Sequence, residues 1–219
     1  MKYFIASDIH GSAYYCRRLL EAYEREGADR LVLLGDILYH GPRNDLPKDY
    51  NPKDVFAMLN EKKDAILCVR GNCDSEVDQM VLEFPIMAPY AILTQGSLVV
   101  YATHGDHYNT HRLPPLQKGD ILLHGHTHLP VWEPFGQDNY YLNPGSASLP
   151  KDGNPHSYLR LGRSDLYLER HGRQGLPRTD FIRSREKGAA CLFGTVGIGP
   201  PSGSSPIREK SENQTDGRP

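Results

Sequence analysis

The chain has 219 residues, of which 38% are hydrophobic and 24% charged, and its formal net charge is −2. That length and composition are typical of a soluble globular protein with one sizeable core. The charge is unevenly distributed, because residues 171–219 carry a net charge of +3 and residues 1–170 a net charge of −5. A net-acidic domain argues against binding to long nucleic acid, which depends on phosphate neutralisation. No segment approaches the ~20 apolar residues of a membrane span.

The N-terminus and the cysteines indicate the cell compartment. The apolar run at residues 3–6 is interrupted by Ser7 and Asp8 and is too short for a signal peptide. The four cysteines form no C-x-x-C pair and no obvious disulfide framework; they are Cys16, Cys68, Cys73 and Cys191. Free thiols are typical of a reducing environment, so we expect a cytoplasmic protein.

The first half of the chain alternates apolar runs with amphipathic helices. The apolar runs predict three buried strands, at residues 3–6, 31–34 and 65–69. Ser12 is expected to cap the first intervening helix and Gly27 to end it. Asn51 followed by Pro52 is a typical start for the second helix. Strands that alternate with helices predict a mainly parallel sheet, in which ligands bind beyond the carboxyl ends of the strands.

The second half is predicted to consist mainly of β-structure. Its apolar segments indicate a hairpin within residues 91–101 and further strands at 121–123, 131–132 and 140–142. A final hairpin is expected from the alternation of Leu159 with Leu161 and of Leu166 with Leu168, turning at residues 162–165. Together the two halves predict an α/β protein in which two sheets pack face to face.

The pattern of strands and helices ends at about residue 171. Gly and Pro account for 13 of the last 49 residues, near the ~25–30% that is typical of low complexity. The apolar stretch at residues 189–193 is too short to build a core. We therefore expect one domain over residues 1–170 and a disordered low-complexity tail over residues 171–219.

Residue types that bind metals follow the ends of several predicted strands. His126 and His128 lie two residues apart, which places both imidazoles on one side of an extended backbone. The full set contains two carboxylates, one amide and four imidazoles: Asp8, His10, Asp36, Asn72, His104, His126 and His128. Without a thiolate, this set suits divalent manganese, iron, nickel or zinc.

Seven ligands are too many for one tetrahedral ion and suit two adjacent ions with a carboxylate between them. Two ions ~3.5–4 Å apart stabilise the attacking and leaving oxygens of an in-line displacement and lower the pKa of a bound water. The residue types therefore predict phosphoester hydrolysis by a metal-activated hydroxide.

The order of these motifs is similar to the signature of the calcineurin-like metallophosphoesterases. The matching blocks are Asp8-x-His10, Gly35-Asp36, Gly71-Asn72-x-Asp74, Thr103-His104-Gly105 and Gly125-His126-Thr127-His128. Over roughly residues 1–160 the chain resembles the small bacterial phosphodiesterases of the YfcE type within that family. The resemblance implies a four-layer α/β/β/α sandwich with mixed sheets and a binuclear centre of the manganese type.

The resemblance also implies how the ligands divide between the two ions. Asp8, His10, Asp36 and His128 would hold one ion, and Asp36, Asn72, His104 and His126 the other. Asp36 is then the bridging carboxylate.

The candidates for catalysis are Asn72, the two residues that follow it (Cys73 and Asp74), and His104. Many phosphomonoesterases of the family carry a histidine where this chain has Cys73, and that histidine is thought to protonate the leaving oxygen. A thiol that ionises donates no proton; alternatively, Cys73 only fills space. Both interpretations favour activated or diester substrates. Asp74 either orients a neighbouring ligand through a hydrogen bond or caps the following helix.

The remaining polar loop residues are weaker candidates. Arg43 is expected to contact a phosphate oxygen as a bidentate donor, with a solvated loop charge as the alternative. His107, and with less support His40, are candidates for substrate contact. The other histidines are expected to be structural, with His124 beneath the metal-binding loop; they are His111, His124 and His156.

The leading functional hypothesis is a metal-dependent phosphodiesterase that acts on a small phosphoester. The alternatives are a phosphomonoesterase or nuclease on the same centre, or a protein-interaction scaffold such as the retromer subunit that resembles these enzymes. An intact ligand set argues against the scaffold, and whether the chain forms a homo-oligomer is left open.

Overall fold

The computed structural model describes residues 1–163 and 189–195. The helices are α1 (Ala13–Glu26), α2 (Pro52–Asn60) and α3 (Glu76–Gln79), with a 3₁₀ turn at Lys63–Ala65. The strands of the first half are β1 (Tyr3–Ala6), β2 (Arg30–Leu33) and β3 (Ile66–Cys68). Those of the second half are β4 (Ala91–Gln95), β5 (Leu98–Ala102), β6 (Ile121–Leu123), β7 (Pro130–Phe135) and β8 (Asn139–Pro144). The last two strands are β9 (Ser157–Arg163) and β10 (Ala189–Thr195).

The two long helices begin and end where the local sequence predicts. The Ser12 hydroxyl accepts a hydrogen bond from the Tyr15 amide at 3.2 Å, and Gly27 ends α1 in the left-handed conformation. Asn51 caps α2 through the Asp54 amide, with Pro52 in the first turn. None of the described helices has both the length and the apolar character needed to cross a membrane.

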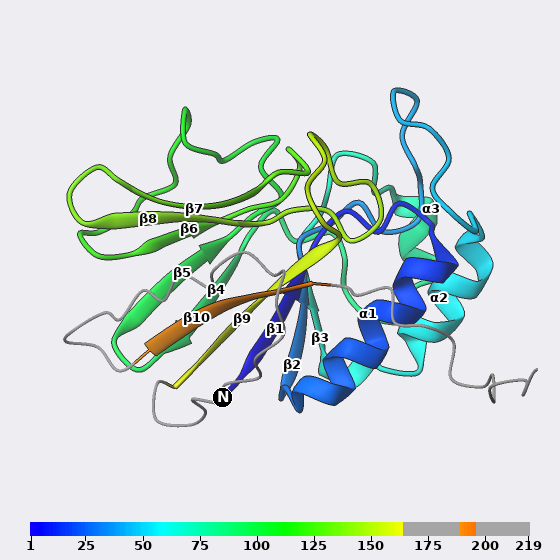
Figure 1. The fold of residues 1–219 in the computed structure, drawn as a ribbon, viewed down its shortest axis with the longest axis horizontal. Coiled ribbons are helices and arrows are strands. Elements are labelled where there is room, and N and C mark those ends of the chain that lie inside the picture. Colours follow the sequence, from blue (N-terminus) through cyan, green and yellow to red (C-terminus); the bar gives the residue numbers. More distant parts are fainter. Residues whose placement is uncertain (164–188, 196–219) are drawn as a thin grey trace, which may run out of the picture.

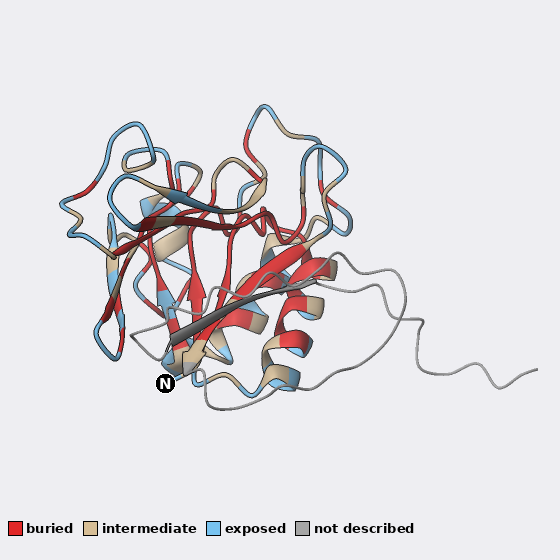
Figure 2. Cartoon of the chain, turned by 60° about the vertical axis from the view of Figure 1, so that its left-hand side comes forward, coloured by how far each residue is buried: buried red, intermediate tan, exposed pale blue. Residues whose placement is uncertain are grey.

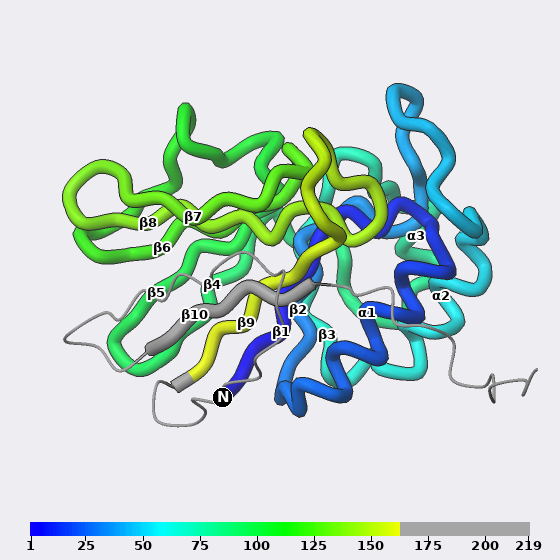
Figure 3. Tube along the Cα trace, viewed as in Figure 1, coloured from blue at the N-terminus to red at the C-terminus, as the bar shows by residue number. Residues whose placement is uncertain are grey.

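The strands form two mixed sheets. The first has the order β10-β9-β1-β2-β3, in which β1, β2 and β3 are parallel and β9 is antiparallel to β1. The second has the order β4-β5-β6-β8-β7, with β5, β6 and β8 parallel. Figure 3 shows that β9, late in the sequence, lies directly beside β1 at the N-terminus.

The side chains of alternate strand positions fill two separate cores. One face of the first sheet packs Phe4 and Leu33 against α1 and α2. Its other face packs Ile5 and Val32 against the second sheet, where they meet residues such as Leu123. Figure 2 shows the buried residues concentrated in the two sheets and along the inner side of the helices. The predicted α/β class with two facing mixed sheets is confirmed, and the arrangement is consistent with the four-layer sandwich that the resemblance implied.

The C-terminal part of the structure differs from the sequence-based expectation. The predicted turn at residues 162–165 is wrong at its start, because Gly162 and Arg163 continue β9 and pair with Ala190 and Ala189 of β10. The turn-forming residue types are overridden there by a strand partner that lies far along the chain. Leu166 and Leu168 lie outside the described residues.

Strand β10 lies within the segment that the sequence analysis assigned to the tail. Residues 189–195, too short to make a core of their own, pair with all seven residues of β9 and extend an existing sheet. The rest of the predicted tail lies outside the described residues, so the division into a domain over 1–170 and a tail over 171–219 stays a prediction.

Candidate metal centre

The predicted ligands gather at one edge, where parallel strands of both sheets end (Figure 1). Asp8 and His10 follow β1, Asp36 follows β2, and Asn72 follows β3. His104 follows β5, and His126 and His128 follow β6. The parallel pairing of β1 with β2, of β2 with β3, and of β5 with β6 brings the strand ends of each sheet together.

One half of the site is formed by Asp8, His10 and His128. The Nε2 atoms of His10 and His128 lie 3.2 Å apart. The Oδ1 atom of Asp8 lies 3.3 Å from Nε2 of His128 and 3.6 Å from Nε2 of His10. All three residues are buried, and their ligand atoms are close enough together to surround one ion.

The other half is formed by Asn72, His104 and His126, with Asp36 between the halves. Nε2 of His104 lies 3.0 Å from Oδ1 of Asn72 and 3.1 Å from Nδ1 of His126. Oδ2 of Asp36 lies 3.5 Å from Nε2 of His104 and 3.7 Å from Nε2 of His10. A single carboxylate oxygen of Asp36 therefore lies within reach of both halves.

Backbone carbonyls orient three of the imidazoles. Nδ1 of His10 lies 2.8 Å from the Tyr39 carbonyl oxygen, and Nδ1 of His104 lies 2.7 Å from that of Leu34. Nδ1 of His128 lies 2.6 Å from the Leu149 carbonyl oxygen. Because a carbonyl only accepts, each Nδ1 carries a proton, and each Nε2 faces the site, where it presents a lone pair when it is deprotonated.

These lone pairs fit a bound cation. Two imidazole lone pairs that face each other at 3.2 Å, as in His10 and His128, repel unless a positive charge lies between them. Oδ1 of Asp8 is also buried without a hydrogen-bond partner among the described residues. Buried polar atoms without partners are costly, and a divalent ion satisfies them together. The residues therefore fit the divalent metals that the sequence predicted.

The charge balance of the site also favours cations. Although burial opposes it, contacts with His10 and His128 hold the pKa of Asp8 well below its usual value. Burial lowers the pKa of His104, but the carboxylates of Asp36 and Asp8 outweigh it and raise the pKa to about 10. The negative field that holds a proton on His104 equally attracts a metal ion in its place.

The ligand backbone is strained. Five of the seven ligands are non-glycine residues with positive φ: Asp8 (58°), His10 (49°), Asp36 (56°), His126 (67°) and His128 (63°). Each such conformation costs ~1–3 kcal/mol and persists only where the surrounding structure imposes it. Strain of this kind clusters at functional sites, which supports the assignment of this edge as the functional one.

Two glycines allow the ligand loops to pack against one another. A Cβ on Gly71 would lie 2.2 Å from Oδ1 of Asp36, and a Cβ on Gly125 would lie 1.9 Å from the Ser7 hydroxyl oxygen. Neither position has room for a side chain. The missing side chain of Gly125 makes room for Ser7 and Asp8.

Asp74 holds the loop that carries Asp36. Its Oδ2 accepts hydrogen bonds from the amides of Asp36 (2.8 Å) and Gly71 (2.7 Å), and its Oδ1 accepts from Ile37 (2.9 Å). The cap of α3 is Ser75, not Asp74. Of the two alternatives for Asp74, the structure favours the one in which it orients a ligand, so Asp74 acts through Asp36.

Cys73 lies beside the half of the site that contains His10. Its sulfur, a nitrogen of His10 and an oxygen of Asp36 all lie within 4.8 Å of one another, and its amide donates to Oδ1 of Asp36 at 2.8 Å. Burial, and then the charge of Asp36, raise the pKa of the thiol to about 12. These surroundings oppose the ionisation that the sequence analysis considered; a bound cation acts in the opposite direction.

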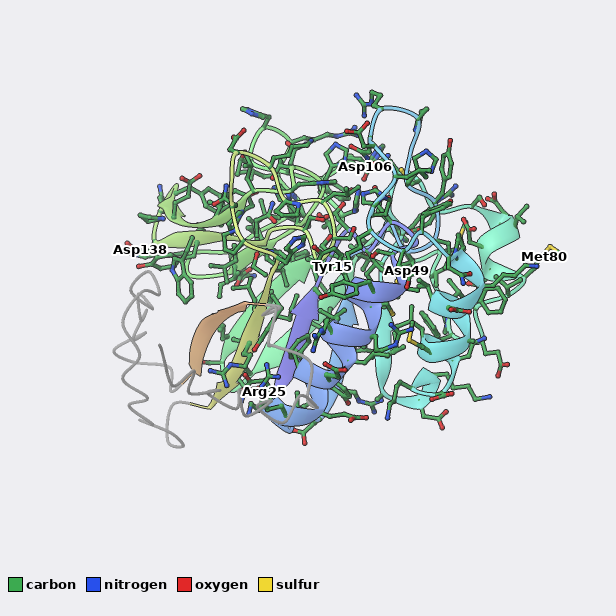
Figure 4. All side chains as sticks on the ribbon, turned by 45° about the vertical axis from the view of Figure 1, so that its right-hand side comes forward. Tyr15, Arg25, Asp49, Met80, Asp106 and Asp138 are labelled. Carbon is green, nitrogen blue, oxygen red and sulfur yellow. The ribbon has the colours of Figure 1, made fainter. Side chains whose placement is uncertain are left out.

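The predicted substrate-binding residues lie on loops near this edge. Arg43 is exposed on the loop between β2 and α2, and a Cβ on neighbouring Gly41 would lie 3.1 Å from the Cys73 sulfur. His107 is exposed on the loop after β5, next to Asp106, which Figure 4 labels at the upper rim. Their contact with a substrate stays a prediction.

The other histidines differ in their surroundings. His40 packs edge-on against Tyr39 and Tyr50. His124 is buried, stacks on Tyr141, and has its pKa lowered to about 4 by burial, as expected for a residue beneath the metal loop.

His156 stacks on Tyr15 with ring centroids 3.8 Å apart, and its Nδ1 bonds to the Ala147 carbonyl, in agreement with a structural role. His111 is exposed. Sequence reasoning missed the carbonyls of Leu34, Tyr39 and Leu149 that orient the ligands, because a backbone carbonyl has no sequence signature.

Comparison with known proteins agrees with this geometry. Residues 1–165 match the family model described as the calcineurin-like phosphoesterase superfamily domain. Phosphodiesterase YfcE of Escherichia coli K12 is 51% identical over 166 residues, which cover 76% of this chain and 90% of that protein. The solved structure of YfcE, described as a phosphoesterase from E. coli, has a TM-score of 0.71 at 50% identity, over 73% of this chain and 87% of that one.

A more distant structure supports the fold alone. A structure described as a novel archaeal phosphodiesterase has a TM-score of 0.52 at 21% identity and covers 73% of this chain and 92% of that one. The family match spans all seven predicted ligands and both described sheets except β10. The chain belongs to the calcineurin-like phosphoesterase superfamily.

Proposed function

We propose that this protein is a metal-dependent phosphodiesterase with a binuclear centre at the strand-end edge. The observation that carries the proposal is the convergence of buried imidazole lone pairs and carboxylates around Asp36, whose Oδ2 lies 3.5 Å from His104 and 3.7 Å from His10. The similarity to a protein named phosphodiesterase YfcE supports the diester as the reaction class.

In this proposal Asp8, His10 and His128 hold one ion, and Asn72, His104 and His126 the other, with Asp36 as the bridge. When bound, two divalent ions acidify a water molecule and neutralise charge that develops on the phosphoryl oxygens. The chain's own contribution is to fix the ligands: carbonyls lock the histidine tautomers, and Asp74 locks the backbone at Asp36. Preorganised ligands need no rearrangement during the reaction.

The residue at position 73 favours substrates with good leaving groups. A neutral thiol is a weaker acid than the imidazolium of a histidine, so Cys73 gives little help to a departing alkoxide. This disfavours phosphomonoesters of simple alcohols as the alternative. The net charge of −5 over residues 1–170 likewise disfavours a nuclease.

Further parts of the proposal concern metal, substrate and surroundings. We propose manganese as the native metal, with iron, nickel or zinc as alternatives that the same donor set accepts. We propose a small phosphoester substrate and a cytoplasmic location; the free thiols of Cys16, Cys68 and Cys73 support the location. The intact ligand set supports an enzyme over a scaffold.

The test is metal analysis combined with a substrate panel. The purified full chain, incubated with manganese and desalted, should retain about two ions per chain, as expected for a binuclear site. It should hydrolyse activated phosphodiesters faster than alkyl phosphomonoesters. Less than about one ion per chain would exclude the binuclear centre. Faster turnover of the monoesters would exclude the diesterase and favour a monoesterase.

Arg43 offers a separate test of substrate contact. Replacing it with alanine should raise KM for a charged diester and leave the metal content unchanged, because Arg43 is exposed and is not a ligand. Arg17→Ala is the matched control, since Arg17 is an exposed arginine on α1. An equal KM for the two variants and the parent would mean that Arg43 is a solvated loop charge.

A further inference from the structure

Residues 143–149, which comprise the end of β8 and the start of the loop that follows it, contact the loops that carry the predicted ligands. Their sequence is Asn-Pro-Gly-Ser-Ala-Ser-Leu, and the side chains of Asn143, Ser146 and Ser148 are buried. The sequence indicated only a turn here. The contacts of Ser146 connect this segment to two ligands of the same half of the site.

The first contact is with the backbone of Asp8. The hydroxyl of Ser146 donates to the Asp8 carbonyl oxygen at 2.8 Å, and the hydroxyl of Ser148 donates to the same oxygen at 3.1 Å. The Ala147 amide donates to the Ser7 carbonyl at 2.9 Å. Asp8 has a φ of 58°, a conformation that a non-glycine residue keeps only when its surroundings impose it. The two hydroxyls fix the peptide plane that follows Asp8.

The second contact leads to His128. The Ser146 oxygen accepts hydrogen bonds from the amides of Ser148 (3.2 Å) and Leu149 (2.8 Å). The carbonyl of Leu149 in turn accepts the Nδ1 proton of His128 at 2.6 Å. The Ser146 hydroxyl thus orders both the strained backbone of one ligand and the residue that orients another. These two ligands approach each other at 3.3 Å.

The half of the site that contains Asn72 lacks these contacts. His104 is oriented by the Leu34 carbonyl, and Asn72 follows β3 in the first sheet. The described contacts of residues 143–149 reach that half only indirectly. Asn143 donates to the Gly125 carbonyl and to the Thr127 hydroxyl, and Oδ2 of Asp8 accepts a hydrogen bond from the His126 amide at 3.1 Å. Loss of the Ser146 hydroxyl is therefore expected to act on one ion more than on the other.

We propose that Ser146 is a positioning residue that sets the metal affinity of the half formed by Asp8, His10 and His128, with Ser148 as a weaker partner. This inference rests on the proposed binuclear centre. Hydrogen-bonding partners of metal ligands typically change metal affinity by ~10–100-fold when removed. A loss of that size at one ion, with the other ion unaffected, is the signature of a positioning role.

The experiment measures manganese binding to the metal-stripped full chain by titration calorimetry and electron paramagnetic resonance. For Ser146→Ala we expect one of two binding steps to weaken ~10–100-fold, and a manganese spectrum that shifts from a coupled pair towards an isolated ion. His128→Ala and Asn72→Ala identify the two halves. The binding step that Ser146→Ala weakens should be the step that His128→Ala abolishes. The same step should still be present in Asn72→Ala.

The matched control is Ser157→Ala. Ser157 is also buried, and its hydroxyl donates to the Pro144 carbonyl at 2.6 Å, in the same segment but without contact to a ligand backbone. The Ser157→Ala variant should bind manganese in two steps with the same affinities as the parent. An equal loss in both serine variants would show general loosening of the segment and overturn the proposal.

Three further results separate the outcomes. If Ser146→Ala does not fold, Ser148→Ala is the test, because the Ser148 hydroxyl makes a single described donor contact, to the Asp8 carbonyl. Ser148→Ala should weaken the same binding step by a smaller factor. Unchanged manganese binding in Ser148→Ala would then overturn the proposal. If the parent binds two ions and Ser146→Ala binds both equally well, the inference fails and the proposed function stands. If the parent binds no ion, the proposed function fails and the inference with it.

Discussion

Replacing Asp74 with asparagine tests a carboxylate that positions the loop of Asp36 but is not itself a predicted metal ligand. The carboxylate accepts three backbone hydrogen bonds, from the amides of Asp36, Ile37 and Gly71. Alanine would leave all three buried donors unsatisfied at ~1–3 kcal/mol each, a total of ~3–9 kcal/mol. That loss approaches the whole stability of a typical domain, ~5–15 kcal/mol. Asparagine is the milder change and allows a folded variant.

The magnitude for Asp74→Asn follows from the same contacts. The remaining amide oxygen can replace Oδ2 and serve Asp36 and Gly71, while the amide nitrogen faces the Ile37 amide. One unsatisfied donor costs ~1–3 kcal/mol, and the loss of charge weakens the other two bonds by ~1 kcal/mol each. We expect a decrease of ~3–5 kcal/mol in the free energy of unfolding, which lowers Tm by ~6–20 °C in a chain of this size.

The assay is thermal unfolding in chelator and in excess manganese. Since Asp74 holds the backbone of the bridging ligand, the variant should also bind manganese ~10–100-fold more weakly, so its Tm gain from manganese should be smaller than the parent's. Asp138→Asn is the control, because it makes the same charge change at an exposed residue paired with Lys118, far from the metal edge in Figure 4. If Asp74→Asn loses no more stability or metal affinity than Asp138→Asn, the positioning role is refuted.

Three further predictions concern the bridge, the thiol and the C-terminal strand. Asp36→Asn should abolish turnover while Tm in chelator stays near that of the parent, and retention of most activity would show that Asp36 is not the bridge. Cys73→His should raise turnover of alkyl esters by up to ~10²–10⁴-fold and that of nitrophenyl esters much less, because a group with pKa ~6.5 can protonate a poor leaving group. If the ratio of alkyl-ester to nitrophenyl-ester turnover is unchanged at equal metal loading, Cys73 lies outside the proton-donor position. A chain that ends after Thr195 should keep the metal content and turnover of the parent. A chain that ends after residue 170 lacks β10, which pairs with β9, and should have a lower Tm. Equal Tm values for the two truncated chains would show that β10 adds no stability.

Local sequence was sufficient for most of the elements. The capping residues Ser12 and Asn51 and the terminating Gly27 act through contacts within a few residues, so α1 and α2 begin and α1 ends as predicted. The β4–β5 hairpin and strands β6 to β8 follow from apolar runs separated by turn residues. The turn expected at residues 162–165 is wrong at Gly162 and Arg163, because these residues pair with β10, which lies beyond residue 188 and outside the reach of a local pattern.

Sequence by itself also indicated which candidate ligands would lie together, since donor types at the ends of parallel strands meet at one edge of a sheet. Only the tertiary structure decided what holds those ligands in place. Asp74 reaches back 38 residues to the Asp36 amide, and Ser146 contacts the Asp8 carbonyl across 138 residues. Such contacts join a side chain to a backbone group, and a backbone group is the same at every position of the sequence. The strain at Asp8 and the lone pairs that face each other at the site likewise exist only once distant strands have been brought together.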